Sequence, residues 1–168
     1  MPEQETIFSE KFKFEGIFSF KDFYRFCHDW LIQETGLTIQ EVKYVEKAKG
    51  ETKDLDIEWK GWVKMTDYFK FDSKIEFKIL FMREIEITDV NGKKIKTNQG
   101  SVEVKCKGIL VRDWQGKFEN NAFQKFLRAL YEKWMIKPRI DQLEEKIFGD
   151  MGDFVEQSKA FLALEGRQ

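Results

Sequence analysis

The stretch FKFDSKIEFKILFMREIEI, residues 69–87, decides the fold of this chain, because apolar residues alternate along it with charged ones. Alternation with a period of two is typical of a β-strand that buries one face. The stretch SVEVKCKGIL, residues 101–110, alternates in the same way. An Asn-Gly pair at 91–92 lies between the two stretches and favours a two-residue turn. We therefore expect a long antiparallel hairpin in which that turn sets Phe77 against Cys106, with apolar residues facing apolar ones.

The flanking sequence predicts the other elements from their periodicity. Ser19 is suited to the N-cap of a first helix, and Gly36 to its end. Apolar residues at helical spacing predict a second helix that begins near Asn120 or Asn121 and runs to Trp134, and Pro138 should break or kink it. We expect further strands at 8–16, 39–47 and 55–65, and a last amphipathic helix within 140–165.

This order of elements predicts an α+β fold of the form β-α-β4-α, in which an antiparallel sheet packs on the helix of residues 123–134. Pairing of the third and fourth strands should set Gly61 opposite Ser73. We expect residues 1–137 to form the domain. Residues 138–168 should form a C-terminal helical extension that packs on the domain or on a partner.

The overall composition narrows the function classes. With 29 basic and 30 acidic residues the net charge is −1, which supplies no overall field for nucleic acid. Cys27 and Cys106 lie far apart without ligand spacing, and His28 is the single histidine, so the sequence predicts no metal site and no cofactor. No apolar run approaches the length of a membrane span, and we expect a cytoplasmic protein.

From about residue 6 to residue 137, the order of elements resembles the helix-grip topology of START-like proteins and of each half of the TATA-box-binding protein. The resemblance implies a curved sheet wrapped around a C-terminal helix. Most helix-grip ligand binders have more strands and a second short helix, so a large internal cavity is not expected here. The chain also resembles uncharacterised small archaeal proteins, and that resemblance implies no function.

The inner face of the expected sheet offers a candidate ligand site, a floor of small residues among aromatic rings. Arg83 interrupts the apolar stripe there and is suited to hold a carboxylate or a phosphate. Alternatively, the hairpin tip that carries Arg83 protrudes past the core into water. The alternative is that the small residues only let the sheet bend and a helix approach. The candidate ligand-binding residues are Trp59, Gly61, Ser73, Phe77, Arg83 and Gly108.

The outer face offers a second candidate, an apolar patch where a solvated surface is expected. Such a patch, with a tryptophan in it, is typical of a partner surface. An equally supported alternative is that the acidic last helix folds back over the patch. The candidate partner-binding residues are Trp62, Ile109, Val111, Phe154 and Phe161.

The sequence therefore predicts a non-enzymatic binding or assembly protein, because it shows no catalytic grouping. The first hypothesis is protein contacts, self-association among them, through the sheet face and the C-terminal helix. The second hypothesis, from a different class, is a START-like carrier of a small apolar or amphiphilic molecule.

Overall fold

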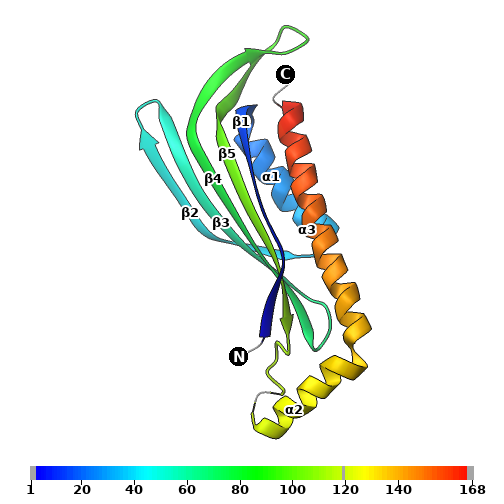
Figure 1. The fold of residues 1–168 in the computed structure, drawn as a ribbon. Coiled ribbons are helices and arrows are strands. Elements are labelled where there is room, and N and C mark those ends of the chain that lie inside the picture. Colours follow the sequence, from blue (N-terminus) through cyan, green and yellow to red (C-terminus); the bar gives the residue numbers. More distant parts are fainter. Residues whose placement is uncertain (1–2, 119, 166–168) are drawn as a thin grey trace.

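The computed structural model describes residues 3–118 and 120–165, and it shows a curved antiparallel sheet with helices on one side (Figure 1). The five strands lie side by side in the order β1-β5-β4-β3-β2. Their bounds are β1 Glu3–Phe18, β2 Thr38–Lys49, β3 Thr52–Lys64, β4 Phe69–Thr88 and β5 Lys94–Arg112. The helices are α1 Phe20–Trp30, α2 Ala122–Leu130 and α3 Lys137–Glu165, with π-helical turns at Leu31–Thr35 (η1) and Tyr131–Met135 (η2).

The expected α+β class and the packing of a C-terminal helix on the sheet are confirmed. Helices α1 and α3 lie on the same side of the sheet (Figure 1). Apolar side chains from the sheet and both helices form one buried core. The sheet contributes the inward-facing residues of every second position, among them Ile57, Phe71, Ile75, Ile79, Val102, Val104, Cys106 and Leu110.

The expectation that residues 123–134 cover the sheet is wrong, because α3 covers it instead. Ile147 and Met151 of α3 lie so close to Gly108 that a Cβ atom there would be 2.8 and 2.9 Å from them. By contrast, Phe123 in α2 is 66% exposed, and Trp134 just beyond it is 71% exposed. Helix α2 projects beyond the end of the sheet (Figure 1). Two amphipathic helices follow the last strand, and the later one packs in the core.

The hairpin of β4 and β5 forms with a register two residues away from the expected one. Phe77 lies opposite Val104 rather than Cys106. The turn is longer than two residues, since the Asp89 carboxylate accepts hydrogen bonds from the backbone N–H groups of Asn91 and Lys93. A shift of two residues keeps each side chain on its face, so the apolar stripe is preserved.

A bulge between Leu80 and Arg83 contradicts the expected alternation near the hairpin tip. Phe81 was expected inside, yet it has a φ of 55° and is 62% exposed. Met82 was expected outside, yet it is buried. The extra residue in one strand reverses which side chains face inward from that point on. Arg83 therefore lies on the other face of the hairpin from Ile79.

The expected helix starts and the inner pairing of β3 with β4 are confirmed. Ser19 caps α1 by accepting a hydrogen bond from the backbone N–H of Asp22, and Asn121 caps α2 in the same way. Gly61 lies opposite Ser73. These contacts are local or follow from a short turn, which is why sequence patterns predict them.

Strand β2 extends beyond the cover of the helices. Every residue from Gln40 to Lys49 is exposed, although β2 pairs with β3 along its length. In Figure 1 the β2–β3 hairpin stands apart from α1. One face of β2 therefore faces α1, and side chains of both elements line the space between them.

Candidate functional site

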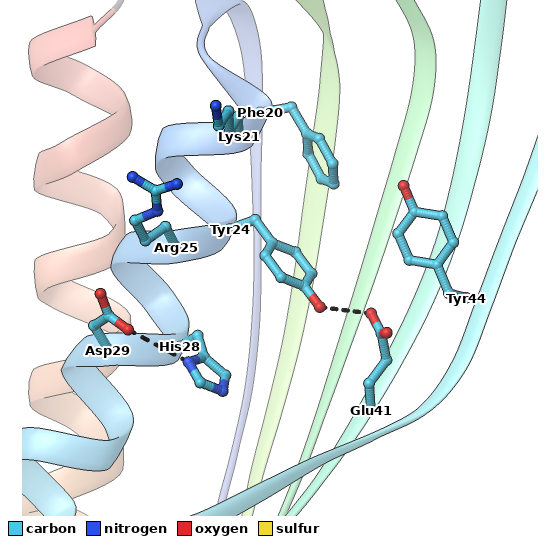
Figure 2. Close-up of a pocket in the computed structure, with 8 residues that line it drawn as sticks. All are labelled: Phe20, Lys21, Tyr24, Arg25, His28, Asp29, Glu41 and Tyr44. Carbon is cyan, nitrogen blue, oxygen red and sulfur yellow. Dashed lines mark hydrogen bonds and ion pairs between the residues drawn. The ribbon is translucent and has the colours of Figure 1, made fainter.

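The groove between α1 and β2 is the main candidate site (Figure 2). Its volume is about 750 Å³, within the range of small-molecule sites, and it is broadly open to solvent. We call it the α1–β2 groove. Its lining residues are Phe20, Lys21, Tyr24, Arg25, His28, Asp29, Glu41 and Tyr44.

Helical spacing places one wall of the groove. Phe20, Tyr24 and His28 are four residues apart in α1, so their side chains lie along one side of the helix. Phe23 and Cys27, on the adjacent side, are fully buried in the core. The burial of Phe23 and Cys27 fixes the rotation of α1 and turns the other three side chains toward β2.

A bulge in β2 places the opposite wall. Glu41 and Tyr44, three residues apart, would point to opposite faces of a regular strand. The pairing with β3 shifts between Glu41 and Lys43, and Glu41 then lies opposite Trp59 while Tyr44 lies opposite Ile57. Both partners belong to the inner face, so the bulge turns Glu41 and Tyr44 to the same side, toward α1.

A hydrogen bond connects the two walls. The hydroxyl of Tyr24 donates to Glu41 Oε1 at 2.6 Å. Burial, and then the hydrogen bond to the Glu41 carboxylate, raise the pKa of Tyr24 to about 12. Burial also raises the pKa of Tyr44 above its ordinary value. Both phenols therefore stay neutral near pH 7, and Tyr24 holds the carboxylate in place as a donor.

Trp59 packs behind the helical wall of the groove and does not itself line it. It is 1% exposed, and its ring packs edge-on against Tyr24 and His28, with ring centroids 5.0 and 5.8 Å away. Its Nε1 is buried and has no hydrogen-bond partner among the residues that the structure describes. The Tyr24 hydroxyl lies close to this indole N–H, and the contact lowers the pKa of Tyr24, against the larger effect of burial.

The charges around the groove are unevenly placed. Figure 2 shows the Tyr24 hydroxyl directed at the carboxylate of Glu41, with the rings of Phe20 and Tyr44 in the same space, whereas Lys21 and Arg25 project away from these rings. His28 is half-exposed and lies 3.4 Å from the Asp29 carboxylate. The charge that faces the aromatic walls is therefore negative.

The chemistry offered by the groove is recognition by rings, phenols and a carboxylate. The nearest thiol, Cys27, points into the core 3.8 Å from Ser158, and burial raises its pKa far above the ordinary value. A buried protonated thiol is a poor nucleophile. Among the described residues, no cluster of three or more His, Cys, Asp or Glu side chains is arranged to hold a metal ion.

Of the ligand candidates predicted from sequence, Trp59 adjoins the groove, and the others lie in the core or elsewhere. The small-residue floor is filled: side chains of Ile39 and Leu37 cover Gly61, and Met151 contacts Ser73. The remaining candidates lie as follows: Gly108 beneath α3, Phe77 buried beside Trp59, and Arg83 exposed and hydrogen-bonded to Gln99.

The partner candidates do not form one exposed patch. Val111 is 2% exposed, whereas Trp62 and Ile109 are half-buried. Phe154 is fully buried and packs on Trp30. The remaining candidate, Phe161, is half-buried and stacks on Phe26 with ring centroids 4.7 Å apart. Both phenylalanines of α3 contact their own chain.

Sequence patterns missed most of the groove, because its walls come from a helix flank and an irregular strand. Broken alternation between Ile39 and Val42, apolar residues three positions apart, was the available signal of the β2 bulge. Nothing in the sequence indicated that β2 would face α1 across open space.

No protein-family model matches this chain, and no curated protein matches it in sequence. No helix among the described residues is long and apolar enough to cross a membrane.

Proposed function

We propose that this chain is a non-enzymatic binding protein that holds a small amphiphilic molecule with a cationic amine in the α1–β2 groove. The observation that carries the proposal is the Glu41 carboxylate among the rings of Phe20, Tyr24 and Tyr44. A cation beside such rings is attracted by their negative faces, and the carboxylate adds a charge-assisted hydrogen bond.

The rest of the ligand should be apolar. The rings offer apolar surface for an alkyl or aryl body. This proposal keeps the class expected from the helix-grip resemblance, a binder of small amphiphilic molecules, but moves the site from beneath the C-terminal helix to the edge of the sheet.

Protein contacts through the outer sheet face have weaker support, since Val111 and Phe154 are buried within the chain.

The buried, protonated thiols of Cys27 and Cys106 support a cytoplasmic location, where thiols stay reduced.

The test measures binding of three probes with the same alkyl chain, octylamine, octyltrimethylammonium and octanoate, by isothermal titration calorimetry at neutral pH. We expect both cations to bind and octanoate to bind at least about tenfold more weakly. Glu41→Gln should weaken binding of the cations about tenfold, because it removes the charge that faces the rings.

The matched control is Glu51→Gln, which makes the same change in the exposed β2–β3 turn and should leave binding unchanged. Circular dichroism checks that both variants stay folded. Equal or tighter binding of octanoate, or cation binding that Glu41→Gln does not alter, would refute the proposal.

A further inference from the structure

Helix α2 and the turn η2 form an arm that carries an exposed apolar face. In Figure 1 the arm lies at the end of the molecule, with the sheet and α3 on one side of it only. The exposed apolar side chains recur at helical spacing, so they share one side of the arm. They are Phe123 (66% exposed), Phe126 (58%), Leu127 (39%), Leu130 (40%) and Trp134 (71%). We call this set the α2 apolar face.

Ion pairs and hydrogen bonds fix the orientation of this face. The Arg128 guanidinium donates to the Tyr68 hydroxyl at 3.2 Å and to Glu3 Oε2 at 2.9 Å. Glu132 accepts from Tyr68 and lies 3.5 Å from Arg112. Arg128 and Glu132 are on the side of the helix opposite the α2 apolar face. The helix is thus held to the domain by its polar side, and its apolar side points away.

The segment that contains α2 is positively charged, unlike the rest of the chain. Residues 117–139 contain six basic and two acidic residues, a net charge of +4, while the remainder of the chain carries −5. Lys125, Lys133, Lys137 and Arg139 enter no ion pair among the described residues. The near-neutral total hides this local excess of positive charge.

We propose that the α2 apolar face inserts into the surface of a membrane containing anionic lipids. A helix with Phe, Leu and Trp on one side and basic residues around it is suited to lie in the interfacial plane. Lysines near the surface add attraction to anionic headgroups. The Lys133 ammonium already lies 5.4 Å from the centre of the Trp134 ring, which places a cation at the border of the apolar face.

A flat surface fits the geometry better than a second copy of the chain. The domain lies behind the polar side of α2, so a bilayer can meet the whole apolar face without contacting the sheet. Two copies joined through this face would bring two regions of net charge +4 together, whereas anionic lipid neutralises them.

The experiment is flotation of the full chain with vesicles of phosphatidylcholine alone and of phosphatidylcholine with phosphatidylglycerol. We expect binding to the anionic vesicles to be at least about tenfold tighter, and to weaken at high salt. Phe126→Ser and Trp134→Ser should each reduce that binding at least about tenfold, because each removes an inserting ring. Lys133→Gln should weaken it about fivefold on anionic vesicles only.

Two matched controls make the result specific. Phe81→Ser removes an equally exposed ring from β4, far from α2, and Lys94→Gln removes a lysine near the hairpin tip. Both should bind like the unaltered chain. The proposal is overturned if anionic vesicles are not bound, or if the α2 variants bind as the controls do. A dimer in solution that Phe126→Ser dissociates, without vesicle binding, would assign the face to a second copy instead.

Discussion

Gly108 sets the distance between the sheet and α3. Any Cβ atom at this position would lie within 3 Å of Ile147 and Met151, so the helix rests directly on the backbone of β5. The sulfur of Met151 also accepts a hydrogen bond from Ser73, and Cys106 contacts the same sulfur. One side chain of α3 therefore fills the space above three small residues of the sheet.

We predict that Gly108→Ala lowers the free energy of unfolding by roughly 1–3 kcal/mol, because the added methyl group must push α3 away. The measurement is urea unfolding followed by circular dichroism. Gly149→Ala is the matched control, since its Cβ would meet nothing within 4 Å. It should be neutral or stabilise by up to about 1 kcal/mol. An unchanged midpoint for Gly108→Ala would mean that α3 lies further from β5.

At the residue scale, the sequence predicted which face of the sheet a side chain occupies better than which residue lies opposite it on the neighbouring strand. Alternation in β4 and β5 gave the correct inward residues up to Ile79, because a register shift of two leaves each face unchanged. It failed at Phe81 and Met82, where an extra residue reverses the faces. Nothing local marks that bulge, since both residues are apolar.

At the scale of elements, α2 and α3 exchange the roles expected for them. Both follow β5 and both are amphipathic, so periodicity alone cannot decide which one packs on the sheet. Long-range fit decides it: the buried residues of α3 include Ile147, Met151 and Phe154, whereas α2 has none among the described side chains. The α1–β2 groove was missed for a related reason, as its two walls meet only in the folded chain.

We predict that replacing phenylalanine by alanine lowers stability strongly in α3 and hardly at all in α2. Phe154→Ala should cost about 3–5 kcal/mol of unfolding free energy, because a fully buried ring is lost from the core. Phe126→Ala should change it by no more than about 0.5 kcal/mol, since that ring is already exposed. Thermal and urea unfolding of both variants give the comparison. Similar losses at the two positions would mean that α2 also packs in the core.

At the scale of the whole molecule, the sheet depends on a helix far along the chain. The inner face of β1 and β5 is covered by α3, and α1 packs against α3 through Phe23 and Phe161. All of these side chains belong to one core. Unfolding should therefore be a single cooperative transition.

We predict that a chain ending at Ile136 does not fold, because the inner faces of β1 and β5 would lose their cover. The expected signs are loss of the near-ultraviolet circular dichroism signal and of a sharp thermal transition. A chain that lacks residues 120–135, with a short glycine-serine link in their place, is the control and should keep both. A folded, cooperative chain ending at Ile136 would show that α3 is dispensable.

The position of α3 after all five strands also bears on how the chain is made. Protein synthesis proceeds from the N-terminus, so all five strands leave the ribosome before α3, the helix that covers β1 and β5. During that interval the apolar side of β5 meets water or another nascent chain. The exposed lysines and glutamates of β2 discourage another chain from pairing with this edge strand of the sheet. The inward-facing positions of β5 from Val102 to Leu110 contain no charged residue that would do the same. The rate at which the last helix emerges and docks thus sets the time during which the chain is open to aggregation.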